Sequence, residues 1–333
     1  MTSPQLSFFC ELDADALQSL FADDQVIDDL KALQAGVNLG LLDLSRARAE
    51  VVRQLNQAGI PVTAWLLLPR EQGYWLNMGN APLAAARYAH FKAWSAENDL
   101  RWSGVGLDIE PDIREVQQLI ERKWSAIARL LRRTLDREGL RRAQAEYSAL
   151  VAQIRADGYR VDSYVIPFVL DERKAGSSVL QRALGLVDIP ADREIPMLYT
   201  SYMRPKGPGL LWSYAAESQA VGLGVTGGGV QIEGMPQIPP LDWQEFERDL
   251  RLARRWTQDI HIFSLEGCIE QGFLGRLRDF DWTQPVTPPL ELADQVARMR
   301  RLLGIALWTS THPFAVLGGV ATILWLLSRR RRG

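Results

Sequence analysis

The chain has 333 residues, of which 47% are apolar and 23% are charged, and this balance excludes wholesale disorder. Two cysteines exclude a disulfide-stapled scaffold, and three histidines exclude a histidine-rich metal centre. From Arg298 onward there are seven arginines and no acidic residue, which leaves 31 basic and 40 acidic residues in the first 297. That acidic excess argues against a nucleic-acid surface, so we expect no nucleic-acid partner.

Apolar runs alternate with helical patterns along residues 6–282. Eight such units in roughly 275 residues predict an α/β fold, a (β/α)8 TIM barrel, over residues 1–283. A long helical region at 114–157 predicts a helical-hairpin extension after the fourth strand. An open doubly wound sheet is the competing architecture, but no glycine-rich phosphate loop follows the first strand. The predicted strands cover residues 6–13, 36–43, 61–69, 102–112, 161–171, 194–202, 220–229 and 259–267.

The fourth predicted strand carries the strongest chemical signal, the segment GVGLDIEPD at residues 104–112. Asp108 and Glu110 are two positions apart on a strand, so their side chains share one face. Strand C-termini form the mouth of a barrel, and two carboxyl groups placed there would retain one proton near neutral pH. This is the property of a general acid and is typical of glycosidic bond cleavage.

The same segment resembles the fourth strand of glycoside hydrolase family 18, the chitinase-like barrels, which carries D-x-x-D-x-D-x-E. Over residues 103–110, Asp108 and Glu110 match the last two acidic positions, while Ser103 and Gly106 replace the two earlier aspartates. Family 25 lysozyme-like barrels have a similar Asp-x-Glu, which matches less closely. The resemblance implies a glycosidase-like barrel in which Glu110 donates the proton and Asp108 orients a substrate N-acetyl group.

A second carboxylate, Glu266, follows the eighth predicted strand and could lie across the mouth from Glu110. A separation of about 5 Å would suit a retaining mechanism, and about 6.5–9.5 Å an inverting one. Alternatively, Glu266 is an acid that complements the dipole at a helix N-terminus. The Asp108–Glu110 pair is itself open to two other interpretations. It could be a structural hydrogen-bonding pair, or part of a divalent-metal site with Glu11 and Asp43, although we expect no metal and no cofactor.

Aromatic residues near the strand ends predict a sugar-binding surface, because their faces stack on the apolar faces of sugar rings. Residues 197–200 are similar to the M-x-Y-D of the family 18 sixth strand, with Tyr199 matching. Trp65 lies within a predicted strand and is expected in the barrel core, and Gly227–Gly229 are expected to form a plain turn. The predicted substrate-binding residues are Glu11, Tyr74, Trp75, Tyr199 and Tyr202.

The C-terminal segment suggests a membrane anchor. Residues 284–301 read as a proline-rich linker with an amphipathic stretch, and residues 302–328 are 27 positions without Asp, Glu, Lys or Arg until the final arginines begin. A helix of that length would cross a bilayer, which predicts a transmembrane segment at 302–328 and an arginine-rich tail at 329–333. An interfacial helix or a buried terminal helix is the alternative. The lack of an N-terminal signal favours a barrel on the cytoplasmic face.

Together these features predict a membrane-anchored glycoside hydrolase-like barrel that acts on a glycan or another sugar-containing substrate and contacts membrane lipid through its C-terminus. The alternative is an inactive barrel that binds carbohydrate or a lipid-linked sugar, or that scaffolds a membrane complex. Absence of acidic residues at Ser103 and Gly106 favours the alternative.

Overall fold

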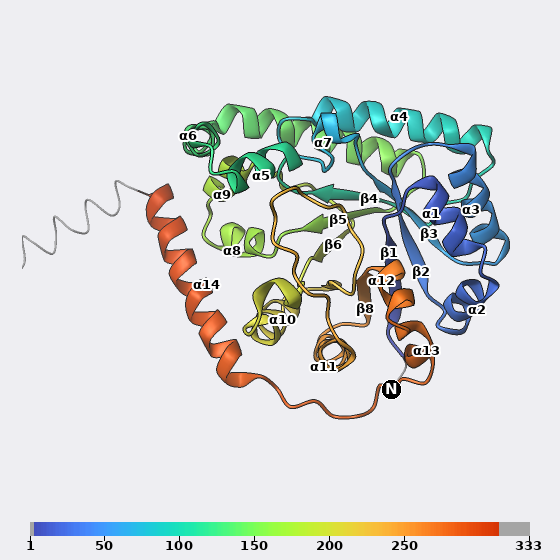
Figure 1. Cartoon of the computed structure of the whole chain (residues 1–333). Coiled ribbons are helices and arrows are strands. Elements are labelled where there is room, and N and C mark those ends of the chain that lie inside the picture. The colour runs from blue at the N-terminus through green and yellow to red at the C-terminus, as the bar shows by residue number, and fades with distance from the viewer. Residues whose placement is uncertain (1–2, 313–333) are drawn as a thin grey trace, which may run out of the picture.

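The computed structural model describes residues 3–312 and arranges eight parallel strands in a barrel (Figure 1). From β1 to β6 each strand pairs with the next, and β8 pairs with both β7 and β1. A bridge between Met197 and Gly222 joins the β6 and β7 sides. The predicted (β/α)8 barrel is confirmed, and each predicted strand overlaps an observed one. The strands are β1 (Gln5–Cys10), β2 (Gly36–Leu41), β3 (Val62–Leu66), β4 (Gly104–Ile109), β5 (Val161–Val165), β6 (Arg193–Pro196), β7 (Val221–Gly224) and β8 (Asp259–Phe263).

The helices lie outside the ring of strands and cover it (Figure 1). Several begin where the sequence supplies a capping side chain: Ser45 accepts a hydrogen bond from the backbone N–H of Arg48, and Asp242 forms a capping box with Glu245. The helices are α1 (Ala14–Phe21), α2 (Asp24–Ala32), α3 (Arg46–Gln57), α4 (Ala81–Glu97), α5 (Ile113–Ile120), α6 (Trp124–Arg133), α7 (Arg137–Ala156), α8 (Phe168–Lys174), α9 (Val179–Leu184), α10 (Gly207–Ala215), α11 (Trp243–Arg254), α12 (Leu265–Glu270), α13 (Phe273–Arg278) and α14 (Leu290–Thr311).

A buried ion network lies at the N-terminal ends of β5, β6 and β8, opposite the strand ends that form a barrel mouth. Asp162 is fully buried and accepts hydrogen bonds from Arg193, at 2.6 Å from Nη2, and from Arg160, at 3.0 Å from Nε. Arg193 also pairs with Asp259, which contacts the His261 ring. Charged groups at this depth are stable only when paired, so the network fixes the starts of three strands relative to one another.

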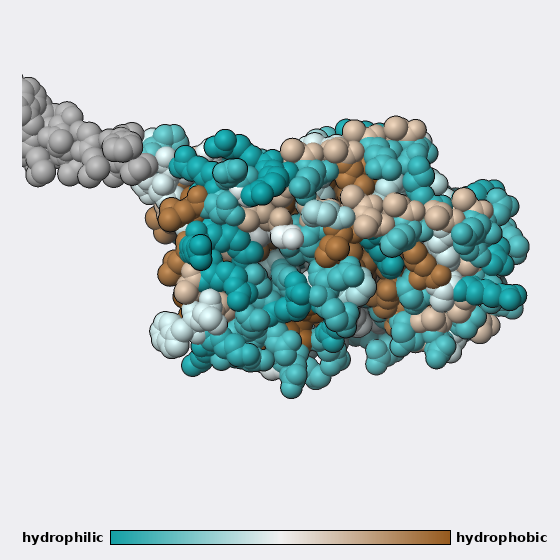
Figure 2. Space-filling view, turned by 90° about the horizontal axis from the view of Figure 1, so that it is seen from above, coloured by the Kyte–Doolittle hydropathy of each residue, from teal (hydrophilic) through white to brown (hydrophobic). Residues whose placement is uncertain are grey.

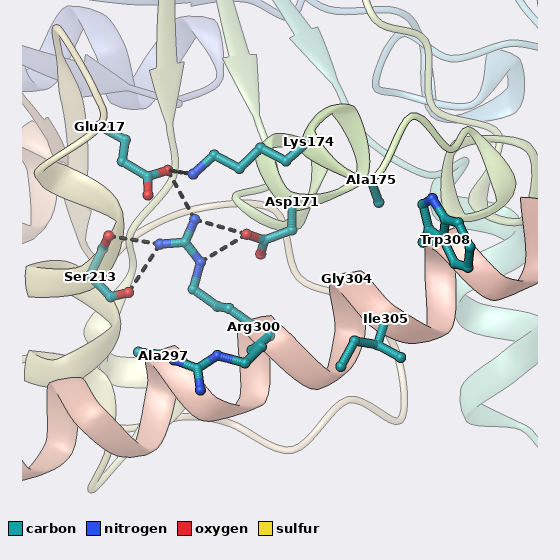
Figure 3. A pocket seen from close by; sticks show the side chains of 11 residues that line it. Asp171, Lys174, Ala175, Ser213, Glu217, Ala297, Arg300, Gly304, Ile305 and Trp308 are labelled. Atoms are coloured by element: carbon teal, nitrogen blue, oxygen red, sulfur yellow. Dashed lines mark hydrogen bonds and ion pairs between the residues drawn. The ribbon is translucent and has the colours of Figure 1, made fainter.

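Helix α14 packs along α8 and α10 on the outside of the barrel (Figure 1). A Cβ atom on Gly209 would lie 2.5 Å from the backbone of Leu292, so only glycine allows α10 and α14 to approach this closely. Arg300 then ties α14 to both neighbours (Figure 3). Its guanidinium binds Asp171 at 2.8 Å, the Ser213 carbonyl at 2.7 Å and Glu217 at 3.0 Å, and lies 3.8 Å from the centre of the Tyr214 ring.

This packing corrects the prediction of a membrane span that begins at residue 302. Within residues 3–312, no helix combines the length and the apolar composition needed to cross a membrane. Leu302–Thr311 instead complete α14, a helix that docks on the barrel through its buried residues Ala293, Val296 and Leu307. The rest of the predicted span, 313–328, and the tail at 329–333 lie outside the described residues. The single-pass membrane localisation is therefore wrong for the described part of the chain.

Figure 2 shows how apolar side chains are distributed over one face of the molecule. Most of the face seen in Figure 2 is hydrophilic, and apolar side chains form separate small patches. One patch lies at the left edge, beside the point where the described chain ends (Figure 2). The exposed apolar residues of α14 in that region of the chain are Leu302, Ile305 and Trp308.

We expect Arg300→Ala to loosen α14, because Asp171 is buried and would lose its cationic partner. Breaking a buried ion pair costs about 3 kcal/mol at the low end of its usual range. Thermal unfolding and limited proteolysis of the connection at residues 279–289 measure the effect. Arg298→Ala is the matched control, since Arg298 is exposed on the same helix. Equal behaviour of the two variants would show that Arg300 does not anchor α14.

Candidate active site

A cavity of about 350 Å³ opens at the C-terminal ends of the strands. Its size is at the small end of the range for small-molecule sites. Three carboxyl side chains face it, one from the end of β1 and two from β4, between walls that are largely aromatic. The lining residues are Phe9, Glu11, Trp65, Trp75, Asp108, Glu110, Pro111, Val116, Tyr164, Ile166, Pro167, Met197, Tyr199, Tyr202, Gly228, Gly229, Val230, Ile232, Met235 and Phe263.

The alternation of β4 places its functional residues at successive depths. Gly106, Asp108 and Glu110 are two apart and share the inward face. At the deepest of these positions a Cβ on Gly106 would lie 2.4 Å from the Tyr164 hydroxyl, so a side chain there would displace the Tyr164 ring. Asp108 lies above that ring and Glu110 follows the strand at the rim. The glycine therefore has a packing role and makes room for the aromatic floor.

Asp108 is a buried carboxyl with an incomplete set of hydrogen bonds. Its Oδ2 accepts a hydrogen bond from the Trp65 indole N–H at 3.1 Å, while its buried Oδ1 has no hydrogen-bond partner among the described residues. Burial, and then the negative charges of Glu110 and Glu11, raise the pKa of Asp108 well above its usual range. The Trp65 hydrogen bond works in the opposite direction but is weaker. Burial therefore favours the protonated form of Asp108, and its Oδ1 contacts no hydrogen-bonding group among residues 3–312.

Glu11 follows β1 and is held by two donors. The Tyr74 hydroxyl donates to its Oε1, and the backbone N–H of Val230 donates to its Oε2 at 3.1 Å. Burial raises the pKa of Glu11 to about 7, while the Tyr74 and Val230 hydrogen bonds lower it and the nearby Glu266 charge raises it. Since both donors favour the carboxylate, Glu11 can act as a base close to neutral pH.

Glu110 is the least constrained carboxyl of the mouth. It is half-buried at the rim, and its carboxyl group makes no hydrogen bond or ion pair within residues 3–312. Its backbone is fixed, because its N–H donates to the Leu76 carbonyl at 3.1 Å. Burial and then the charge of Glu11 raise the pKa of Glu110 to about 8. Glu110 is thus a protonated acid at neutral pH and is free to contact a ligand.

Aromatic rings form the floor of the cavity. The Phe9 ring packs against Tyr164 and Trp65 with centroids 4.7 and 5.2 Å apart, and Trp65 lies 6.2 Å from Phe263. Trp65 was expected to serve only as core packing. It does pack in the barrel, but it also lines the cavity and donates to Asp108. The sequence offered no reason to single out Phe9, Tyr164 or Phe263, since each lies in an apolar run that is equally typical of core.

The walls contain most of the predicted substrate-binding aromatics. Trp75, Tyr199 and Tyr202 line the cavity, and the Tyr199 and Tyr202 rings lie 6.1 Å apart. Tyr202 is half-exposed, so its ring is accessible from the solvent. Tyr74 is buried and is absent from the lining residues, but its hydroxyl orients Glu11. Its φ of 65° and that of Gly73, 106°, are left-handed, which turns the chain sharply enough to bring the Tyr74 ring under Glu11.

A long connection between β7 and α11 covers one side of the mouth. It contributes Gly228, Gly229, Val230, Ile232 and Met235 to the cavity. Sequence reasoning predicted a plain turn at Gly227–Gly229 and assigned no role to the residues after it. All three glycines have positive φ, and this allows the connection to turn back over Glu11. The length of the connection could have indicated that its residues line the mouth, since long loops of barrels often carry binding residues.

Glu266 is not part of the cavity lining. It lies in the first turn of α12, where its Oε1 accepts a hydrogen bond from the Glu11 backbone N–H at 3.3 Å. The geometry therefore places Glu266 behind Glu11 and not across an open mouth from Glu110. Burial raises the pKa of Glu266. The charge of Glu266 raises the pKa of Glu11, so Glu266 influences the mouth through Glu11.

The mouth does not fit a metal site built from its own carboxylates. Within residues 3–312 no three His, Cys, Asp or Glu side chains are grouped as metal ligands would be. Both oxygens of Glu11 already accept protein hydrogen bonds, and Asp43, a member of the suggested ligand set, pairs with Arg48 at 2.9 Å.

We expect Tyr74→Phe to raise the pKa of Glu11 above 7, because the Tyr74 hydrogen bond lowers it in the wild type. The measurement is an NMR titration of the labelled Glu11 carboxyl. If an activity needs ionised Glu11, the acidic limb of its pH profile would then move to a higher pH. Tyr88→Phe is the control, since Tyr88 donates to Asp157 away from the mouth. An unchanged Glu11 titration would contradict the assigned contact.

These features define a class, a (β/α)8 barrel whose mouth holds three carboxyl groups between aromatic walls. No protein-family model matches the chain, and no curated protein matches it either. Among solved structures, the chain is similar to a xylose isomerase-like TIM barrel protein from Mycobacterium smegmatis in complex with magnesium. The identity is 13% and the TM-score 0.46, over 84% of this chain and 99% of that one. It is also similar to L-ribulose 3-epimerase, with 13% identity and a TM-score of 0.42 over 95% and 98% of the two chains. For D-psicose 3-epimerase the identity is 12% and the TM-score 0.39, over 91% of this chain and 99% of that one.

The expected relation to chitinase-like or lysozyme-like glycoside hydrolases is wrong. The similar structures are described as a xylose isomerase-like barrel and two sugar epimerases, and not as glycoside hydrolases. The geometry of β4 gives a physical reason for the departures from the family 18 motif. Ser103 is exposed before the strand begins, and Gly106 has no room for a carboxylate beside Tyr164. The predicted function as a membrane-anchored glycoside hydrolase depended on that resemblance and is wrong as well.

Proposed function

We propose that this protein is an acid–base enzyme that isomerises or epimerises a small sugar in the mouth of the barrel. One observation carries the proposal: Glu11 and Glu110 face one aromatic-walled cavity with pKa values raised to about 7 and about 8. Between these values one group is largely ionised and the other largely protonated, which is the state that general acid–base catalysis requires.

The reaction that fits is proton transfer next to a carbonyl group. The Glu11 carboxylate takes the proton from the carbon beside the carbonyl, and the carbonyl oxygen receives a proton from Glu110, which gives an enediol. Glu110, now ionised, takes the proton of the neighbouring hydroxyl, and Glu11 returns its proton to carbon. Both carboxyl groups end in their starting states. When Glu11 returns its proton to the neighbouring carbon, the sugar is isomerised. In an epimerisation Glu110 instead takes its proton back from the original carbonyl oxygen, and Glu11 delivers its proton to the other face of the first carbon after the enediol has turned in the mouth.

The remaining lining residues suit a polyhydroxylated substrate. The Asp108 oxygen that has no hydrogen-bond partner can form a hydrogen bond with a sugar hydroxyl, as donor when Asp108 is protonated and as acceptor when it is ionised. Trp75, Tyr199 and Tyr202 present faces and edges on which the C–H side of a sugar can stack. The cavity of about 350 Å³ is suited to a monosaccharide rather than a polymer.

The test is solvent exchange at carbon. The full chain is incubated in D2O with aldoses and ketoses of five and six carbons, and deuterium at carbon is read by NMR. We expect exchange with at least one sugar of the panel, and none with the Glu11→Gln variant. If the wild-type protein catalyses no exchange with any sugar of the panel, the proposed function is wrong.

A further inference from the structure

A second cavity lies against the mouth and is almost entirely apolar. Its volume is about 520 Å³, larger than that of the mouth itself. Five residues line both cavities and so form the partition between them: Ile166, Pro167, Met197, Tyr199 and Tyr202. The remaining lining residues come from α8, α10, α14 and the turn before α10, and they include Phe168, Leu210, Val296 and Leu303.

Resting on the proposed function, we infer that this apolar cavity holds a hydrocarbon or aromatic substituent of the sugar whose polar ring occupies the mouth. The mouth is polar and the second cavity is apolar, as are the sugar ring and the substituent of such a substrate. Carboxyl groups face the mouth, whereas the second cavity is lined by aliphatic and aromatic side chains with Arg300 as its one charged residue among those described. The two compartments adjoin at the half-exposed ring of Tyr202, and the inferred ligand extends from one to the other past that ring.

The cavity wall formed by α14 is held in a defined place. The Arg300 guanidinium is engaged by Asp171, Ser213 and Glu217 (Figure 3). It also lies 3.8 Å from the centre of the Tyr214 ring, so its charge has partners within the fold. Val296 is buried, whereas Met299 and Leu303 keep partial exposure. A wall that is anchored by buried polar contacts and lined with aliphatic side chains is suited to hold an apolar group without rearrangement.

The inference predicts that affinity rises with the hydrocarbon length of a ligand. Alkane-1,2-diols of four, six and eight carbons serve as probes, because their vicinal hydroxyls resemble part of a sugar and their chains differ only in methylenes. Each methylene that enters the cavity should tighten binding by up to about fourfold. Isothermal titration calorimetry on the full chain measures the three dissociation constants.

Two neighbouring residues of α14 provide matched variants. Leu303→Asp places a carboxylate on the cavity wall, whereas Leu302→Asp makes the same change at a residue that is 67% exposed and does not line the cavity. We expect Leu303→Asp to abolish the dependence on chain length and Leu302→Asp to retain it. Met299→Asp is a second cavity variant in case Leu303→Asp does not fold, since Met299 is 46% exposed and tolerates a polar group.

Each result decides the inference. Affinity that does not change with chain length in the wild type overturns it, and so does a chain-length dependence that survives both Leu303→Asp and Met299→Asp. The deuterium-exchange test depends on Glu11 and Glu110 and involves no residue of α14, so failure of the proposed function would appear there and not in the diol series.

Discussion

A Glu110→Gln variant is expected to catalyse deuterium exchange into the sugar 10²- to 10⁴-fold more slowly than the wild type, the usual contribution of a positioned general acid. Glutamine has nearly the same shape as glutamate but has no proton to give at neutral pH. Because the Glu110 carboxyl makes no hydrogen bond within residues 3–312, the substitution removes no contact that stabilises the described fold. The unfolding temperature should therefore remain close to that of the wild type.

The pH dependence provides an independent measurement of the same assignment. Exchange requires ionised Glu11 and protonated Glu110, whose pKa values are about 7 and about 8. The rate should fall below pH 7 as Glu11 gains a proton and fall above pH 8 as Glu110 loses one. The two carboxyls interact, so the observed values belong to the pair. The Glu110→Gln variant should lose the basic limb and keep the acidic one.

The matched control for Glu110→Gln is Glu121→Gln, since Glu121 lies on the surface at the end of α5 and pairs with Lys123. That variant should keep both the rate and the two limbs of the pH profile. A Glu110→Gln rate within threefold of the wild type, with the basic limb intact, would remove Glu110 from the mechanism.

The second large effect concerns stability and the opposite end of the barrel. Asp162→Ala should lower the free energy of unfolding by about 3 kcal/mol, because it removes the fully buried carboxylate that pairs with both Arg193 and Arg160. Asp162→Asn retains the size of the side chain and should cost less. Urea unfolding monitored by tryptophan fluorescence measures both variants.

A surface ion pair gives the contrast for this measurement. Glu50 pairs with Arg46 at 2.9 Å, but both side chains are largely exposed. Glu50→Ala should therefore cost no more than about 0.5 kcal/mol. If Asp162→Ala cost as little as Glu50→Ala, the network at the barrel base would contribute nothing to holding the strands together.

The barrel was predictable because its strands are short apolar runs that alternate with amphipathic helices. Periodicity also placed Asp108 and Glu110 on one face, and the strand ends brought Glu11, Tyr199 and Trp75 to the mouth. The depth of each residue was not predictable. Nothing local in the sequence indicates that Tyr164 occupies the space left by Gly106, because that contact joins two strands.

The remaining errors have the same origin. The roles of Tyr74 and Val230 depend on loops that turn back on Glu11, residues far apart in the sequence. The apolar residues of Leu302–Thr311 are compatible with a lipid environment, but composition alone does not say which surface covers them. In the structure Leu307 is buried, whereas Leu302, Ile305 and Trp308 stay exposed. The Arg300 contacts that hold α14 in place involve residues 83–129 positions away.

The single bridge between β6 and β7 makes one line of the barrel easier to open than the rest. Every other pair of neighbouring strands shares at least four register positions, whereas here Leu198 donates to Gly222 at 2.7 Å beside one isolated bridge. Local opening follows the line of fewest backbone hydrogen bonds, so the Leu198 amide should exchange with solvent faster than those of β1–β5. Met197 and Tyr199 flank that amide and are two of the five residues that form the partition between the two cavities. The partition between the cavities therefore lies where the barrel can open locally with the loss of the fewest backbone hydrogen bonds.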